Sequence, residues 1–278
     1  MKNATAYQKK LQKFLGDMKK VKAAAPPTGI EAVEVLVRSI LEADVTDSAA
    51  EAAFQTIRQE YVDINELRVS PIIDITDRLG HDFPQPRLKA EAITGALNKT
   101  FDRTYAISID YMKEMTKRDL RRHLLEIGLS PYAAACVVLK VFGGHAVPVD
   151  DTLVEVLKMD GCVHPDSDLQ DVQGFLERVI PQKDAFSAHA FLREYVVRSA
   201  KALARKRKAD AEAAAKAEAE AKAKAEAEAA LQAERAKKRA KAARKKRDKQ
   251  AKKDKKAKKR KAAGKAGKKT PAKAIDKK

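Results

Sequence analysis

The chain has 278 residues, of which 58 are Lys or Arg and 39 are Asp or Glu, so its formal net charge is +19. No run of about 18 apolar residues occurs, and the N-terminus lacks the apolar stretch of a signal peptide. We therefore expect an intracellular protein without a membrane span, in the cytoplasm or nucleoid, or in the nucleus of a eukaryote.

The cysteine and histidine content argues against a metal centre. Two cysteines, Cys136 and Cys162, cannot build a disulfide framework, a Cys-based zinc site or an iron–sulfur site, and we expect both to be buried as small apolar residues. The five histidines show no ligand spacing with acids or thiols. We expect neither a metal nor a cofactor.

The positive charge is concentrated at the C-terminus. Residues 201–278 hold 32 basic and 10 acidic side chains, whereas residues 1–200 hold 26 and 29. Together with composition, this predicts four regions: a basic N-terminal helix at 1–24, a folded domain at 25–203, an Ala/Glu/Lys helical spacer at 204–233 and a disordered basic tail at 234–278.

The first region has Tyr7, Leu11 and Phe14 at helical spacing among lysines, which predicts a basic amphipathic helix. Pro26 and Pro27 then end it, because proline cannot continue a helix. A domain therefore begins at about residue 25.

The domain itself reads as helical throughout. Apolar residues recur three and four positions apart, with proline or glycine between the segments, and no convincing strand pair occurs. This predicts an all-α fold with one core or two lobes. The expected helices lie at about 30–42, 47–59, 70–79, 86–100, 117–127, 131–142, 150–158, 168–179 and 185–203.

The spacer has no apolar face that it could bury against a core, and beyond Glu234 the acidic residues become rare. A basic tail of this kind binds polyanions with little sequence preference and with an affinity that falls steeply with salt, and it resembles the arms of linker histones. Non-specific nucleic acid is therefore the expected partner. A solubilising tail, or one that binds acidic proteins or a membrane surface, has the same composition.

Residues 119–161 contain the strongest motif. A basic helix ends in Gly128-Leu129-Ser130-Pro131-Tyr132, an apolar helix follows to Gly143, and Val149-Asp150-Asp151-Thr152 opens a third helix. This arrangement resembles the helix-hairpin-helix DNA glycosylases of the endonuclease III type. Their hairpin Leu-Pro-Gly-Val-Gly-x-Lys-Thr-Ala falls without a gap on residues 126–134, and their Val-Asp-Thr-His falls on residues 149–152.

The similarity extends over about residues 28–200. It includes residues 40–47, which are similar to the family's Leu-Ser-Ala-Gln-Ala-Thr-Asp, residues 87–93, and residues 189–195 of the last core helix. The resemblance implies a two-lobed helix-hairpin-helix fold, a duplex DNA partner with a flipped base, and a monomer.

The resemblance also implies functional residues. Asp150 falls at the catalytic aspartate, which stabilises the cation-like sugar as the base leaves and orients water. Tyr132 falls at the hairpin lysine and is expected to line the pocket. The expected DNA-binding residues lie in the hairpin and on the basic helix before it: Gly128, Leu129, Ser130, Lys117, Arg121 and Arg122.

Each of these residues also has a plainer interpretation. Asp150 precedes an apolar helix and suits an N-cap, as do Asp151 and Thr152. Tyr132 also suits packing under the hairpin, and the basic residues before the hairpin suit a solvated helix face.

The chain departs from the family pattern at several positions. Tyr132 cannot form the Schiff base of the bifunctional enzymes, so we expect no lyase activity of that kind, as in the thymine-mismatch glycosylases of the same superfamily. Ser130 replaces the second glycine of the hairpin, and Pro131 after it lacks the N–H that could reach a phosphate. Asp44 stands where the family has a glutamine that fills the gap left in DNA by the flipped base. The four cysteines of the family's iron–sulfur cluster are absent.

Two hypotheses follow. In the first, the protein is a monofunctional DNA glycosylase-like base-excision repair protein with Asp150 as the catalytic carboxylate. In the second, it is a catalytically inactive relative that binds nucleic acid or organises the nucleoid through its tail. Ser130, Asp44 and the net charge of −9 over residues 25–200 favour this second hypothesis.

Overall fold

The computed structural model describes residues 4–16 and 29–266, and within these ranges it contains helices and no strand, which confirms the all-α prediction. The chain divides into two units, Met1–Lys206 and Arg207–Lys278, which are described separately.

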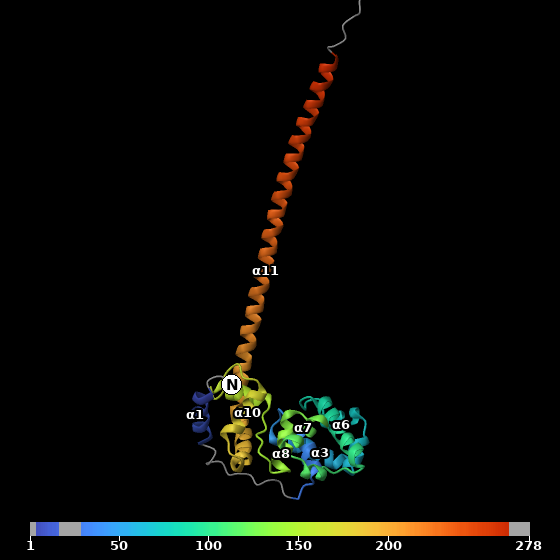
Figure 1. Cartoon of the computed structure of the whole chain (residues 1–278), viewed down its shortest axis with the longest axis vertical. Helices are drawn as coiled ribbons and strands as arrows, with labels where there is room; N and C mark the ends of the chain where they lie inside the picture. Colours follow the sequence, from blue (N-terminus) through green and yellow to red (C-terminus); the bar gives the residue numbers. More distant parts are fainter. Residues whose placement is uncertain (1–3, 17–28, 267–278) are drawn as a thin grey trace, which may run out of the picture. The chain divides into compact units, whose positions relative to one another are not determined.

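The helices are shown in Figure 1. They are α1 (Ala4–Leu15), α2 (Ala32–Glu42), α3 (Asp47–Glu60), α4 (Ile64–Val69), α5 (Ile72–Leu79), α6 (Pro86–Thr104), η2 (Asp110–Glu114), α7 (Lys117–Glu126), α8 (Pro131–Lys140), α9 (Asp151–Met159), α10 (Leu169–Val179), η3 (Gln182–Asp184) and α11 (Ala185–Ala266). Three short elements, α4, η2 and η3, were not predicted, because three to six residues are too few to show a helical period.

The first unit has two hydrophobic cores, which are the two expected lobes. The first core is built mainly from α2, α3, α6, α7 and α8 and includes Leu36, Phe54 and Leu97. The second is built from α1, α9, α10 and the start of α11 and includes Leu157 and Phe175. Packing of these amphipathic helices removes their apolar stripes from water, which is the main stabilising term.

Helix α1 belongs to the second lobe. The sequence sets residues 1–24 apart as a region, but Leu11 is fully buried in the second core. The ring of Phe14 also lies 5.4 Å from that of Phe191 and 4.6 Å from that of Tyr195, centroid to centroid. The remainder of that region, residues 17–28, lies outside the described residues.

Helix α11 enters the second unit and continues to Ala266, whereas the sequence predicts disorder from residue 234. The composition explains the difference, because alanine, lysine, arginine and glutamate are all strong helix formers. Lys208 lies 4.0 Å from Glu212 in an i,i+4 ion pair of the kind that supports such a helix. Residues 267–278 lie outside the described residues.

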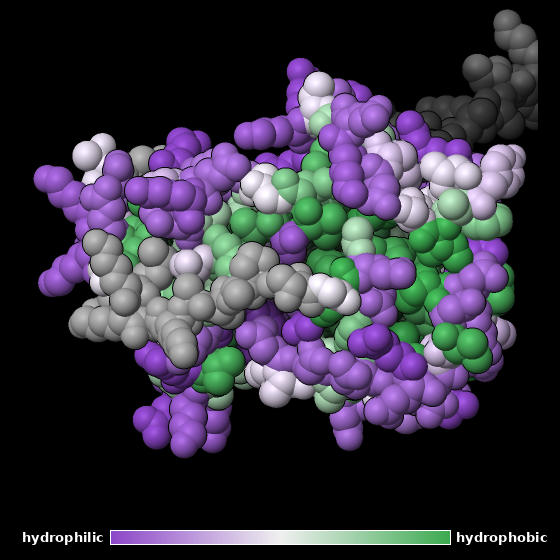
Figure 2. Space-filling model, turned by 90° about the horizontal axis from the view of Figure 1, so that it is seen from below, coloured by the Kyte–Doolittle hydropathy of each residue, from purple (hydrophilic) through white to green (hydrophobic). Residues whose placement is uncertain are grey.

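Figure 2 views one face of the first unit, where hydrophobic residues reach the surface in patches between hydrophilic ones. Val62, at 92% exposure, and Ile73, at 62%, are among the large apolar side chains exposed to solvent. In the described ranges, no helix combines the length and apolar character that crossing a bilayer requires.

Candidate active site and nucleic-acid interface

Helices α7 and α8 form the predicted hairpin. Gly128 has a φ of 105°, which an L side chain rarely adopts, and this lets the Leu129 N–H donate to the Leu124 carbonyl at 3.2 Å. Ser130 then caps α8, since its Oγ accepts from the Ala133 N–H at 3.2 Å, and Pro131 occupies the first helical position. Glycine and serine thus end one helix and start the next within four residues.

The residues predicted to bind DNA fall into two groups. Lys117, Arg122, Gly128 and Ser130 are exposed on α7 and the turn. The Leu129 side chain is only 4% exposed and packs in the first core, so only its backbone is available to a partner.

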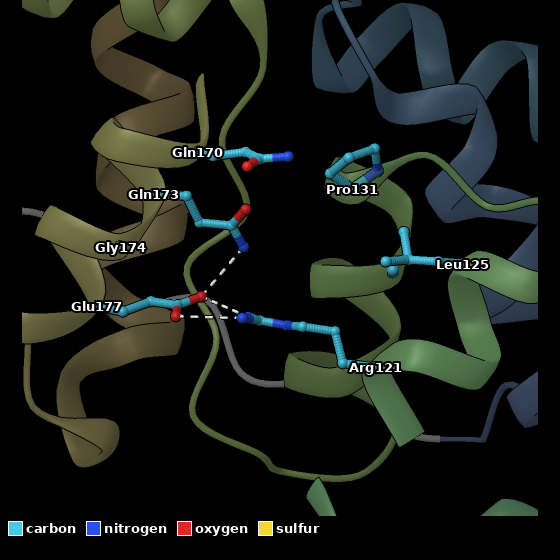
Figure 3. A pocket seen from close by; sticks show the side chains of 8 residues that line it. Arg121, Leu125, Pro131, Gln170, Gln173, Gly174 and Glu177 are labelled. Carbon is cyan, nitrogen blue, oxygen red and sulfur yellow. Dashed lines mark hydrogen bonds and ion pairs between the residues drawn. The ribbon is translucent and has the colours of Figure 1, made fainter. Parts of the chain in front are cut away.

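Arg121 differs from the rest of this set because it is already paired. Its Nη2 lies 2.5 Å from Oε1 of Glu177, and its Nη1 lies 3.4 Å from Oε2 (Figure 3). Gln173 donates to the same Oε1 at 3.1 Å. Arg121 therefore links the hairpin to α10, and sequence reasoning missed Glu177, which lies 56 residues away.

A cavity of about 260 Å³ lies beside this pair. Its lining comes from α7, α8 and α10 and consists of Arg121, Leu125, Pro131, Ala134, Gln170, Gln173, Gly174 and Glu177 (Figure 3). Asp150 is not among these lining residues, so this cavity lies beside the hairpin and apart from the predicted catalytic position.

Asp150 lies at the seam between the two lobes and caps α9. Its Oδ1 accepts from the Leu153 N–H at 2.8 Å, and its Oδ2 accepts from the Asp44 N–H at 3.2 Å. The residue is 8% exposed. Asp150 is therefore an N-cap, as the plainer interpretation predicted. Each oxygen of a carboxylate can accept a second hydrogen bond, so both Asp150 oxygens can still accept one from a substrate or a water.

The environment raises the pKa of the Asp150 carboxyl above its ordinary value. Burial is the main cause, and the charge of Asp44 adds to it, whereas the Leu153 N–H, Arg193 and the Asp44 N–H act in the opposite direction. Buried carboxyls with raised pKa values occur frequently at functional sites.

Asp44 is bound to the second lobe through its side chain. Its backbone is left-handed, with a φ of 55°, and its Oδ1 accepts from the Thr152 N–H at 3.2 Å and from the Thr152 hydroxyl at 2.9 Å. The sequence places Asp44 where the family carries a residue that fills the gap in DNA. In the structure its carboxylate stabilises the N-terminus of α9 instead.

Lys89 is a buried cation that sequence reasoning did not identify as part of the site. Its Nζ donates to the carbonyls of Leu41 and Ala43, each at 2.8 Å, so it satisfies the end of α2. Burial lowers its pKa to about 8, while Asp44 and Asp150 act to raise it. These carboxylates are therefore close enough to act on its charge.

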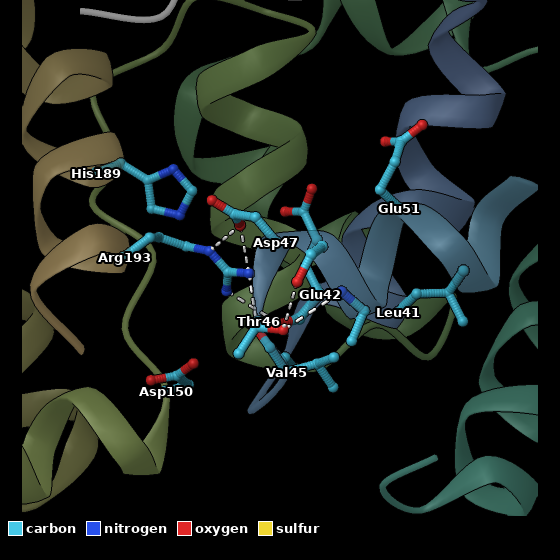
Figure 4. A network of polar contacts seen from close by, with 12 residues as sticks. Leu41, Glu42, Val45, Thr46, Asp47, Glu51, Asp150, His189 and Arg193 are labelled. Atoms are coloured by element: carbon cyan, nitrogen blue, oxygen red, sulfur yellow. Dashed lines mark hydrogen bonds and ion pairs between the residues drawn. The ribbon is translucent and has the colours of Figure 1, made fainter. Parts of the chain in front are cut away.

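Arg193 of α11 holds the loop that follows α2 (Figure 4). It donates to the carbonyls of Glu42 at 3.0 Å and Val45 at 2.8 Å, and it pairs with Asp47 at 2.5 Å. Since Arg193 comes from the second lobe and the loop from the first, this network joins the lobes.

Tyr132 is packed under the hairpin and also belongs to this network. It is 4% exposed, and its hydroxyl accepts from Arg193 at 2.8 Å and lies 3.4 Å from Nε2 of His189. Burial raises the pKa of Tyr132 well above its ordinary value, and its pKa is also affected by the charge of Asp150. Tyr132 is therefore a neutral phenol close to the predicted catalytic carboxylate.

The residues do not fit the iron–sulfur cluster of the resembled family. Cys136 and Cys162 are the only cysteines in the sequence, and four are needed. In the part of the chain that the structure describes, no three His, Cys, Asp or Glu side chains are grouped as metal ligands.

Sequence comparisons assign the chain to no family: no model of a known protein family matches it, and no curated protein matches it significantly. Solved structures do match. One is an endonuclease III trapped in a covalent DNA intermediate, with a TM-score of 0.55 and 20% identity, covering 67% of this chain and 84% of that one.

Two further solved structures are similar. The 8-oxoguanine glycosylase/lyase of Clostridium acetobutylicum in complex with DNA has a TM-score of 0.52 and 15% identity over 71% of each chain. A thermostable thymine-DNA glycosylase has a TM-score of 0.50 and 14% identity, covering 69% of this chain and 87% of that one. The chain therefore has the fold of the helix-hairpin-helix DNA glycosylases, as its hairpin motif predicted.

Proposed function

We propose that this protein is a monofunctional DNA glycosylase of base-excision repair, which hydrolyses the N-glycosidic bond of a damaged or mismatched base with Asp150. The observation that carries the proposal is the position of Asp150: a buried carboxylate with a raised pKa, at the start of α9, on the seam between two lobes of this fold.

The chemistry follows from that position. When the bond between sugar and base breaks, the sugar becomes cation-like, and a fixed carboxylate in a water-poor site stabilises it more than it would in water. The Leu153 and Asp44 N–H groups fix the Asp150 carboxylate in place, so little reorganisation is needed during the reaction. The remaining lone pairs suit the orientation of an attacking water.

Tyr132 determines that the proposed reaction stops at the abasic site and does not go on to cleave the strand. A phenol cannot form an imine with the sugar, so the proposed reaction ends at an abasic site that another enzyme must cleave. Its hydroxyl, held by Arg193, is suited to lining the site rather than to covalent chemistry.

The proposed partner is duplex DNA, bound with one base turned out of the stack. The exposed hairpin residues Gly128 and Ser130, at the start of α8, suit a phosphate, since helix N-termini favour anions. Lys117 and Arg122 add positive charge nearby. The basic residues beyond 201 supply non-specific attraction to nucleic acid, and the proposed site of action is therefore inside the cell.

A second candidate is a catalytically inactive relative that binds nucleic acid through its tail. Both oxygens of Asp150 already accept backbone N–H groups, Arg121 is paired with Glu177, and residues 25–200 carry a net charge of −9. These features favour a closed scaffold over an active cleft.

An excision screen separates the two candidates. End-labelled duplexes carrying uracil, mismatched thymine, alkylated purine or oxidised purine are incubated with the full chain and with a chain ending at Lys206, then treated with alkali to reveal abasic sites. A duplex that already carries an abasic site is incubated without alkali, to test for strand cleavage by the protein itself. Excision of at least one base by both chains supports the glycosylase. If no base is released and all DNA binding is lost with the tail, the inactive scaffold is correct.

A further inference from the structure

Arg193, on α11, is buried and extensively hydrogen-bonded. Its side chain is 9% exposed. It donates four hydrogen bonds: Nε to Asp47, Nη1 to the Glu42 carbonyl and the Tyr132 hydroxyl, and Nη2 to the Val45 carbonyl. A buried charge needs such partners, because its removal from water is costly without them. These acceptors belong to the first lobe, whereas Arg193 belongs to the second.

Two of these bonds hold the loop between α2 and α3 on either side of Asp44. The acceptors are the carbonyls of Glu42, two residues before Asp44, and of Val45, one residue after it (Figure 4). Asp44 has a left-handed backbone, with a φ of 55°. A residue other than glycine keeps this conformation only where its surroundings fix it. Arg193 is therefore one of the groups that fix the backbone at Asp44.

The fixed backbone of Asp44 in turn holds Asp150. The Asp44 N–H donates to Oδ2 of Asp150 at 3.2 Å, while Oδ1 accepts from the Leu153 N–H of α9. The bond from Asp44 is thus the one that orients this carboxylate from the first lobe. Thr152 holds the Asp44 carboxylate separately, through its N–H and its hydroxyl. Loss of Arg193 would therefore free the Asp44 N–H while its carboxylate stays tied beside Asp150.

Arg193 also acts on Asp150 through its charge. Burial is the main cause that raises the pKa of Asp150 and the Asp44 carboxylate adds to it, whereas Arg193 and the Asp44 N–H oppose it. Lys89 of α6 and Tyr132 of α8 are further titratable groups close enough for the Asp150 charge to affect their pKa values. The charge of Arg193 and the N–H that it holds in place both favour the ionised form of Asp150.

We propose that Arg193 is a positioning residue of the proposed glycosylase, which fixes the loop at Asp44 and thereby keeps the Asp150 carboxylate in one orientation. This inference rests on the proposed function. It goes further because it gives a role in the reaction to a residue that reaches Asp150 through the loop. A clamp that only joins the lobes would lower stability when removed, but would leave the orientation and the ionisation of Asp150 as they are.

The first test is amide hydrogen exchange at Asp44, which needs no substrate. In Arg193→Met the protection of the Asp44 amide should fall about tenfold, because the loop opens more often. Arg68→Met is the matched control, since Arg68 donates to Asn65 and Asn98 and joins α4 to α6. It removes the same charge and should leave exchange at Asp44 unchanged.

The second test is single-turnover base release as a function of pH, on the duplex that the excision screen identifies. Arg193→Met should slow release about tenfold or more, because a misplaced catalytic group costs at least that much. Its Kd for the duplex should stay within about twofold, since Arg193 is buried. The rate falls as pH drops through the pKa of Asp150, and in Arg193→Met this fall should occur at higher pH. Arg68→Met should keep the pH profile of the unmodified protein.

A second variant guards against a folding defect in Arg193→Met. Arg193→Lys keeps the charge in the buried site but loses the planar fork that reaches both carbonyls of the loop. Its rate should be intermediate, and the pH at which the rate falls should return toward that of the unmodified protein.

The outcomes separate this inference from the proposed function. Unchanged exchange at Asp44 in Arg193→Met, or slower release with an unmoved pH profile, overturns the inference and leaves the glycosylase function standing. If the full chain releases no base while Arg193→Met still loses protection at Asp44, the glycosylase function fails and Arg193 is only a clamp between the lobes.

Discussion

Asp44 donates its backbone N–H to Oδ2 of Asp150 across the seam between the lobes, at 3.2 Å, although 106 residues separate them. At the same place the Asp44 carboxylate accepts two hydrogen bonds from Thr152. One loop residue of the first lobe thus fixes both the Asp150 carboxylate and the start of α9, and its own charge acts on the pKa of Asp150.

Asp44→Asn should therefore change the pH dependence of excision more than stability. Asparagine tolerates the left-handed backbone and keeps an oxygen for Thr152, but it removes a charge that raises the pKa of Asp150. Excision requires the ionised carboxylate, so the rate falls as pH drops through that pKa, and in Asp44→Asn the fall should occur at lower pH. The measurement is the single-turnover rate as a function of pH.

Asp151→Asn is the control for that experiment. Asp151 is exposed and follows Asp150 directly, yet its charge is not among the main causes that shift the pKa of Asp150. The acid limb should stay where it is in the unmodified protein. A limb that is unmoved in Asp44→Asn, or that moves to higher pH, contradicts the assignment.

Lys89→Met should destabilise the first lobe. The carbonyls of Leu41 and Ala43 would lose their buried donor, which costs about 1–3 kcal/mol in the free energy of unfolding. Lys99→Met is the control, since Lys99 also donates to a carbonyl, that of Glu126, but at an exposed position. Urea unfolding at pH 7 measures both.

Lys89 should also make the free energy of unfolding depend on pH. Because the pKa of Lys89 is about 8 in the folded state and near 10.5 in the unfolded state, the unfolded chain binds more protons between these pH values. Its contribution to the free energy of unfolding therefore rises as pH increases from about 8 toward 10.5. Lys89→Met should lack this rise and Lys99→Met should retain it; equal slopes in all three proteins would show that Lys89 titrates normally.

The sequence predicted the parts of this fold that depend on neighbours along the chain. The hairpin, the cap at Asp150, and most helix bounds follow from local signals such as Gly128 and apolar spacing. The contacts of Lys89 and Arg193 with the loop after α2 join residues 46 to 151 positions apart, and no local pattern marks them.

The sequence also could not predict which charged side chains form ion pairs between the lobes. Arg121 and Arg122 look alike on α7, but Arg121 faces Glu177 of α10 while Arg122 pairs with Asp119 and Glu126 on its own exposed helix. Which of two adjacent arginines remains available to DNA depends on packing between the lobes.

Glu177→Gln should accordingly strengthen DNA binding by about threefold, because it releases Arg121 to a phosphate beside the hairpin. Stability should change by less than about 1 kcal/mol, since the pair is partly exposed. Fluorescence anisotropy with a labelled duplex measures the affinity. Glu60→Gln, which frees Arg78 from a similar pair on α3 and α5, is the control and should show a smaller gain. Equal gains would mean that only net charge matters.

Removal of the residues after Lys206 should reduce the salt dependence of DNA binding. Residues 207–278 hold 29 basic side chains, and each phosphate that they neutralise releases a counterion. The slope of log Kd against log salt concentration should become markedly shallower in the chain ending at Lys206. An unchanged slope would place the DNA contacts in the first unit alone.

The proposed catalytic role of Asp150 is tested by single-turnover base release in Asp150→Asn. Asp168→Asn is the matched control, because Asp168 caps α10 through the Asp171 N–H as Asp150 caps α9 through the Leu153 N–H. We predict that Asp150→Asn loses base release by at least about a thousandfold while keeping salt-sensitive DNA binding, and that Asp168→Asn stays active. Base release by Asp150→Asn at the rate of the unmodified protein would show that Asp150 is not the catalytic carboxylate.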